Sequence, residues 1–365
     1  MTIFLAGDVM TGRGVDQILP HPSAPHLHEP FVDDAREYVR LAEDVTGTLA
    51  RSVGSTYIWG DALALWEQVA PAARLVNLET SLTRSDDYDV SKGIHYRMHP
   101  ENIACISAAG FDVCALANNH VLDYGRAGLV ETLQTLEGAG IMTVGAGRNI
   151  EEARRPRVLA LADGTRLIVG ACGHESSGIP ADWAAREDAP GVDLLRDLSD
   201  ETAAGLAARV TADKHRGDVA VVSIHWGDNW GYDVPHRHVE FAHRLVEQGI
   251  DVVHGHSSHH VRPIEVYRQK LILYGCGDFI NDYEGIAGNE RYRDDLVLMF
   301  FPSIDSATGR LMALQIFPLQ IRKLRLNRPS SEDARWVCDT LNRINGSFGV
   351  RVELTSDRML TMAWP

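Results

Sequence analysis

The chain has 365 residues, of which 45% are hydrophobic and 23% are charged, and its formal net charge is −15 at pH 7. Such a composition is that of a globular protein with room for one large domain or two ordinary ones, and the negative charge disfavours nucleic acid or an anionic membrane as the main partner. There is no apolar run of about eighteen residues and no basic N-terminal segment, so we expect a soluble, cytoplasmic protein without a membrane span.

Short apolar runs alternate with amphipathic patterns along most of the chain, which predicts an α/β fold. In chain order, we expect strands at 2–7, 74–78, 112–117, 166–171, 219–225, 251–255, 270–275 and 295–301. Amphipathic helices are expected near 101–109, 126–139, 200–214 and 236–248. From about 261 to 325 strands outnumber helices, so the sheets should be mixed rather than purely parallel.

Two irregular segments interrupt this alternation, at 20–60 and at 85–100. The first is rich in proline, histidine and acidic residues, and the second mixes charges with aromatic residues. Long irregular segments in a compact domain are often functional lids, so we predict insertions over the site or surface. A helix over 331–344 and strands at 350–354 and 359–364 predict a small C-terminal appendix, 326–365, after a catalytic domain at 1–325.

Polar side chains follow six of the expected strands directly. Ligands in open α/β sheets bind at the carboxyl ends of strands, where loops converge while the strands stay buried. The side chains are hard or borderline donors, which suit a divalent Ca, Mn, Mg, Zn or Fe ion and disfavour a thiolate site. The residues are Asp8, Glu79, the run Asn118–Asn119–His120, His225, the run from His254 to His260, and Asp278.

Each of these residues also has an ordinary structural explanation. Asp8 could cap a helix, Asn118 and Asn119 could occupy a turn, and His225 could be a hydrogen-bonded core histidine. The run HGHSSHH is different, because it places four histidines within seven residues directly after a buried strand. Six strands that end in this way are hard to explain by packing, so together they predict a metal site.

Several residues beside these motifs are candidates for substrate contacts. We predict this role for Trp226, Trp230, His174 and Asp278. The cysteines, in contrast, are five in number, widely spaced and without a CxxC pair, which predicts buried free thiols of a reducing compartment.

The motifs resemble those of a known family. They are GDVM at Asp8, NLETSLT at Glu79, ANNHVLDYG at His120, SIHWGDNWGY at His225, HGHSSHHVRPIEVY at His256 and LILYGCGDFI at Asp278. They occur in the order seen in CapA-like proteins, the poly-γ-glutamate or capsule-synthesis relatives of the calcineurin-like metallophosphoesterases. The resemblance covers about residues 1–325 and implies a four-layer αββα sandwich with mixed sheets and metals at one edge of the paired sheets.

The sequence departs from the metallophosphoesterase pattern at one metal position. The usual Asp-x-His has Met10 in place of its histidine, and Glu79 stands where the second motif has a bridging aspartate. The sequence therefore disfavours a tight two-metal phosphoesterase. A single ion could be held by Glu79, Asn119 and either His225 or His256, and the full set of candidate metal ligands is Asp8, Glu79, Asn119, His225, His256 and His259.

Spare histidines and carboxylates could then transfer protons. The pairs considered are His120 with Asp123, His225 with Asp228, and His256 with Asp8 or His259, which gives a catalytic set of Asp8, His120, Asp123, His225, Asp228 and His256.

This set predicts a metal-dependent acid/base enzyme acting on a peptide or polyglutamate-like substrate. The first hypothesis is a peptide Cα-epimerase, because MslH-type epimerases of lasso-peptide precursors resemble this group. The alternatives are a metallophosphoesterase or amide hydrolase linked to poly-γ-glutamate or capsule synthesis, and a non-catalytic metal- or peptide-binding module.

Overall fold

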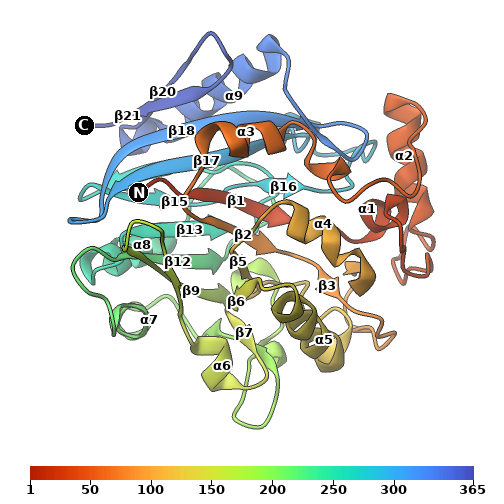
Figure 1. The fold of residues 1–365 in the computed structure, drawn as a ribbon, viewed down its shortest axis with the longest axis horizontal. Coiled ribbons are helices and arrows are strands. Elements are labelled where there is room, and N and C mark those ends of the chain that lie inside the picture. Colours follow the sequence, from red (N-terminus) through yellow and green to blue (C-terminus); the bar gives the residue numbers. More distant parts are fainter.

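The computed structural model describes residues 1–365, and two large mixed β-sheets form its centre (Figure 1). The strands of the first sheet are β1 (Phe4–Val9), β2 (Arg74–Leu78), β5 (Val113–Ala115), β6 (Met142–Val144), β16 (Asp278–Ile280), β17 (Leu296–Asp305), β18 (Arg310–Ile321), β19 (Leu326–Asn327), β20 (Arg351–Leu354) and β21 (Leu360–Ala363). They pair in the order β20-β21-β18-β17-β1-β2-β5-β6, with β16 beside β1 and β19 beside β18. Strand β1 runs parallel to β2 and β16 and antiparallel to β17.

The second sheet is formed by β8 (Arg157–Ala160), β9 (Arg166–His174), β11 (Leu194–Leu195), β12 (Val219–His225), β13 (Val252–His256), β14 (Ile264–Tyr267) and β15 (Lys270–Leu273). Its order is β11-β9-β12-β13-β15-β14, with β8 paired to β9. Two short ribbons lie outside the sheets: β3 (Ser81–Leu82) with β4 (Arg97–Met98), and β7 (Ala146–Gly147) with β10 (Gly191–Val192).

Nine α-helices surround the sheets: α1 (Arg13–Ile18), α2 (Arg36–Thr46), α3 (Ala62–Val69), α4 (Ile103–Ala108), α5 (Gly125–Gly138), α6 (Ile150–Arg154), α7 (Asp200–Thr211), α8 (His236–Glu247) and α9 (Ser331–Ile344). Two of the longest helices begin with a hydroxyl cap. The side chains of Ser199 and Ser330 accept hydrogen bonds from backbone N–H groups at the starts of α7 and α9. None of the helices combines the length and the apolar composition that crossing a bilayer requires.

Alternation along the strands divides the core into layers. In β12, Val221 points between the two sheets and packs in one cluster with Leu5 of the first sheet, whereas Val222 points outward and packs with Phe241 of α8. The outer face of the first sheet packs against α3 and α5 in a third cluster. The predicted α/β class and the layered αββα arrangement are therefore confirmed.

The eight expected strands and four expected helices are all present. The C-terminal helix occupies the predicted 331–344, and the two strands after it pair with each other. Because β21 also pairs with β18, this hairpin extends the first sheet, as the blue ribbons of Figure 1 show. The segment 20–60 differs from its irregular prediction in containing the eleven-residue helix α2.

Parallel pairing brings the polar strand ends together. Asp8 at the end of β1 lies opposite both Asn77 of β2 and Asp278 of β16. In the second sheet, His225 at the end of β12 lies opposite His256 at the end of β13. Parallel strands end at the same edge of a sheet, and the two sheets are packed face to face, so these side chains converge.

Candidate functional site

Three side chains from three strands form the centre of the candidate site. Ligand atoms of Asp8, His225 and His256 all lie within 4.8 Å of one another. The Nδ1 atoms of the two histidines are 2.9 Å apart, and Asp8 Oδ1 is 3.7 Å from His256 Nδ1. All three residues are at most 1% exposed, so the cluster is shielded from bulk water.

A chain of hydrogen bonds between the sheets fixes the tautomer of His256. His254 Nε2 donates to the carbonyl of Ala6, 2.8 Å away, because that oxygen can only accept. His254 Nδ1 must then accept from the Ser223 hydroxyl at 3.0 Å, and Ser223 Oγ accepts in turn from His256 Nε2 at 2.8 Å. His256 Nδ1 is left with a free lone pair directed at the cluster.

His225 is oriented in the same way from the other side. Its Nε2–H group donates a hydrogen bond to the amide oxygen of Asn119, 2.8 Å away. The lone pair of His225 Nδ1 therefore faces that of His256 Nδ1. Burial is the main cause that holds the pKa of both imidazoles well below the ordinary range, so neither carries a second proton at neutral pH.

Carboxylates crowd beside these lone pairs. Burial and the neighbouring Asp278 raise the pKa of Asp8 to about 7, and burial and Asp8 raise the pKa of Glu79 well above its usual range. Asn77 Nδ2 donates to Asp8 Oδ1 at 2.7 Å and to Glu79 Oε2 at 3.3 Å. A buried group of acceptors with so few donors is an environment that favours a cation.

The donor set fits a divalent metal ion. Asp8, His225 and His256 offer one carboxylate oxygen and two imidazole lone pairs around a common point, with Glu79 and Asn119 beside them. Facing lone pairs 2.9 Å apart repel each other unless a proton or a cation lies between them. Mixed nitrogen and oxygen ligands suit zinc, manganese or iron.

A first histidine–carboxylate pair borders the cluster. His120 Nδ1 lies 2.6 Å from Asp123 Oδ2, and His120 Nε2 lies 3.8 Å from Glu79 Oε1. Asp123 is fully buried and also accepts from Lys92 and from the backbone N–H of Tyr96. Burial lowers the pKa of His120 to about 4 despite Asp123, so this imidazole is a neutral base.

A second pair lies on the other side of Asp8. His259 Nδ1 is 2.9 Å from Asp278 Oδ1, and Asn281 holds the other oxygen of Asp278 at 2.6 Å. Burial acts to lower the pKa of His259, but the charge of Asp278 and its hydrogen bond outweigh burial and raise the pKa. The two histidines are therefore driven in opposite directions, as acid and base partners require.

Three predicted residues are not brought to the cluster. The side chain of Asp228 is exposed and does not pair with His225. Trp226 follows His225 by one position, so strand alternation turns it to the outer face, where it stacks on His238 at 4.5 Å. His174 is hydrogen-bonded to Ser176 at 2.8 Å and caps a short 3-10 turn.

Several residues that contact the site were missed from the sequence. Asn77 lies two positions before Glu79 on the same face of β2, so alternation could have identified it. Ser223 lies two positions before His225 in β12 and carries the same signal. Lys92, in contrast, comes from an irregular segment in which no periodicity places a side chain.

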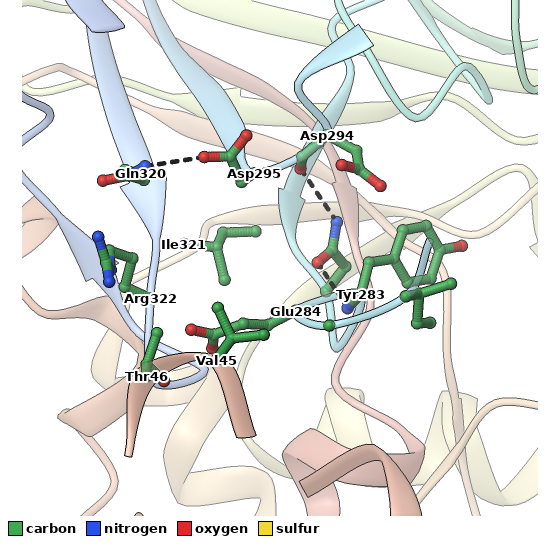
Figure 2. A pocket seen from close by; sticks show the side chains of 12 residues that line it. Val45, Thr46, Tyr283, Glu284, Asp294, Asp295, Gln320, Ile321 and Arg322 are labelled. Atoms are coloured by element: carbon green, nitrogen blue, oxygen red, sulfur yellow. Dashed lines mark hydrogen bonds between the residues drawn. The ribbon is translucent and has the colours of Figure 1, made fainter. Parts of the chain in front are cut away.

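A cavity of about 520 Å³ opens beside His259. Trp230, a predicted substrate contact, and Tyr283 form part of its wall, and Tyr283 OH is 3.3 Å from His259 Nε2. A separate cavity of about 240 Å³ also has Tyr283 and Asp294 in its wall. Figure 2 shows it with Asp295 and Gln320 among its other lining residues. The larger cavity is the one that reaches the histidine–carboxylate cluster.

Sequence comparisons assign the chain to a family. The family described as bacterial capsule synthesis protein PGA_cap matches residues 2–283. The chain belongs to this family. The expected CapA-like resemblance is thus confirmed, and so is a buried His/Asp group suited to a divalent metal.

The relatives give the family its context. The chain is 50% identical, over 99% of its length and 95% of the relative's, to a probable polyglutamine synthesis accessory protein of Mycobacterium tuberculosis. It is 24% identical to the capsule biosynthesis protein CapA of Bacillus anthracis, over 88% of this chain and 68% of that protein. It is 28% identical to the PGA biosynthesis protein CapA of Bacillus subtilis, over 68% and 61%. Neither the family description nor these names refers to an epimerase.

Proposed function

We propose that this chain is a metal-dependent hydrolase that cleaves an amide bond in the synthesis of a polyglutamine-type or capsular polymer. The observation that carries the proposal is the convergence of the Asp8, His225 and His256 cluster with the His120–Asp123 pair. The names of the relatives support the polymer context. The resemblance of the motifs to those of metallophosphoesterases supports hydrolysis.

Asp8, His225 and His256, with Glu79 and Asn119, would hold the ion. A divalent ion bound there would supply Lewis-acid polarisation of the substrate carbonyl. The facing lone pairs and the raised pKa values of the carboxylates are what support this assignment. Met10, which stands where the related enzymes have a histidine, is buried and offers no such ligand.

The chain's own residues would handle the protons. Asp123 holds the Nδ1 proton of His120, so Nε2 is free to take a proton from water as that water forms the new C–O bond. His259, whose pKa Asp278 raises, would give a proton to the departing amine as the C–N bond breaks. The opposed pKa shifts of the two histidines support this division of roles.

The test is a metal-reconstitution assay. Chelator-stripped protein would be supplied with Mn²⁺, Zn²⁺, Mg²⁺ or Ca²⁺ singly and incubated with γ-glutamyl peptides and with an aryl phosphate ester. We expect metal-dependent release of new amino groups and about a 10²- to 10⁴-fold loss in His120→Gln. The control is His243→Gln, because His243 pairs with Glu265 on the outer helix α8. Phosphate release without new amino groups would refute the amide hydrolase.

Cα-epimerisation of a peptide is the second candidate. Two histidine–carboxylate pairs, His120–Asp123 and His259–Asp278, border the same cluster, and an epimerase needs two proton-transfer groups at one α-carbon. The same assay in deuterated water separates the two reactions by mass. One non-exchanging deuterium without cleavage would support the epimerase, whereas cleavage without deuterium at Cα would exclude it for that substrate.

A further inference from the structure

We infer that the cavity beside His259 binds a neutral, apolar group of the substrate, an aromatic or branched aliphatic side chain next to the bond that the site cleaves. This inference rests on the proposed function, because it specifies what adjoins the scissile amide. An interior bond of a homopolymer of glutamate carries no such group. The cavity would therefore select a junction or a peptide of mixed sequence.

The apolar part of the cavity wall comes from helix α2 and from three loops. Leu41 lies in the segment 20–60, Ile94 in 85–100, Trp230 in the loop after β12, and Ile286 in the loop after β16. Both segments predicted as insertions over the site thus help to build it. Most of the sixteen lining residues are hydrophobic, and the volume of about 520 Å³ is of the size that encloses small organic groups.

No free cation lines this cavity. Arg13 is its one arginine, and both its charge and its donors are already used: Nη2 and Nε bond to Asp282 at 2.5 and 3.1 Å, and Nη1 lies 3.3 Å from Glu29. The rings of Tyr38 and Tyr96 cover the guanidinium at 3.8 and 4.3 Å. A glutamate side chain entering here would lose water and find no cation except His259, which is already paired with Asp278.

The remaining charges of the cavity strengthen this selection. His259 is paired with Asp278, and the side chain of Asp294 makes no ion pair with any arginine or lysine. Figure 2 shows Asp295 directed toward Gln320 and the carboxylate of Asp294 directed away from it. Asp294 has no positive partner, and burial together with the neighbouring Asp278 raises its pKa to about 7. Such a carboxyl offers an anionic group no attraction, repels it when ionised, and tolerates neutral groups.

Phe31 marks the entrance. It is 92% exposed although it lines the cavity, and Ile286, which lines the same cavity, is 39% exposed. Exposed apolar side chains gathered at the mouth of a pocket mark a ligand-binding surface more often than scattered ones do. Burial of a phenyl group from the ligand against these walls would raise affinity by about 10- to 100-fold.

The test measures binding apart from turnover. The probe is N-acetyl-4-fluorophenylalanine amide, followed by ¹⁹F NMR line broadening on the full-length protein. We expect N-acetyl-phenylalanine amide to displace the probe at a concentration at least ten times lower than N-acetyl-glutamate amide does. Ile286→Arg should abolish broadening, and Val158→Arg, on β8 outside the cavity, should retain it. Thermal midpoints would verify that both variants are folded.

A charge reversal gives the decisive result. Asp294→Lys should shift the preference at least tenfold toward the glutamate amide. Equal displacement by the two amides, or an unchanged preference in Asp294→Lys, would overturn the inference. Binding of apolar probes without hydrolysis of any amide would refute the hydrolase while leaving the cavity assignment intact. Hydrolysis of all-glutamate substrates that Ile286→Arg leaves unaffected would support the hydrolase and refute the cavity assignment.

Discussion

Asp123→Asn separates the catalytic role of the His120–Asp123 pair from its structural role. The carboxylate is fully buried and lies 2.6 Å from His120 Nδ1. An asparagine of the same shape can present its NH₂ group to Nδ1, which moves the imidazole proton to Nε2 and removes the base. We expect kcat to fall about 10³- to 10⁴-fold, or roughly 4–5.5 kcal/mol of activation free energy.

The same change should destabilise the fold through Lys92. This ammonium group is only 13% exposed and is ion-paired to Asp123, so the neutral amide leaves it nearly buried and uncompensated. Removing one partner of a buried pair costs about 3–5 kcal/mol, and Lys92 keeps its bond to the carbonyl of Asn119, so we expect about 3 kcal/mol. Urea unfolding followed by circular dichroism measures this loss.

The double variant Lys92→Met/Asp123→Asn tests the reasoning. It removes the stranded charge, so we expect it to recover most of the free energy of unfolding and none of the activity. Two results would refute the account. One is a kcat for Asp123→Asn within tenfold of the wild type. The other is a double variant as unstable as Asp123→Asn alone, which would mean that Lys92 was not the cause.

Three further outcomes follow from the structure. Burial raises the pKa of Asp8 to about 7, and the proton that Asp8 holds below this pH must leave when an ion binds. Mn²⁺ affinity measured by calorimetry should therefore be full well above pH 7. Below pH 7 it should fall by roughly tenfold per pH unit. Ser223→Ala breaks the hydrogen-bond chain to His256 and should weaken metal affinity about 10- to 100-fold, with about 1 kcal/mol lost in unfolding. Gly255→Ala would place a methyl 2.6 Å from two carbonyl oxygens and should cost about 1–3 kcal/mol in urea unfolding, whereas Gly205→Ala, which meets nothing within 4 Å in α7, should be neutral or stabilising.

Strand periodicity made most of the fold and the centre of the site predictable. Asp8, His225 and His256 each end a buried strand, and parallel strands end at a common edge, so their convergence follows from the pattern alone. The same periodicity would have turned Trp226 away from the site, since it is one position from His225. The prediction of Trp226 as a substrate contact rested on residue type rather than on strand face.

Side chains on irregular segments could not be placed in this way. Lys92 reaches Asp123, and Arg13 reaches Asp282, across long stretches of sequence and without any local period. The Lys92 contact depends on how the segment 85–100 lies over the sheets, and the Arg13 contact on how α1 meets the loop after β16, and tertiary packing decides both. The cavity wall at Ile94 and Ile286 was out of reach for the same reason.

Two groups of buried side chains could hold a metal ion, and they share Asp8: one adds His225 and His256, and the other adds His259 and Asp278. The balance of buried charge bears on the first group. Four carboxylates surround the cluster, those of Asp8, Glu79, Asp123 and Asp278, and all are buried. When Asp8 and Glu79 are ionised, as a bound cation favours, Lys92 offsets one of the four carboxylates and His259, whose pKa Asp278 raises, can offset another. Two negative charges then remain beside two neutral imidazoles, and one divalent ion held by Asp8, His225 and His256 would neutralise them. Met10, which stands in place of the usual histidine, adds no further ligand to this group.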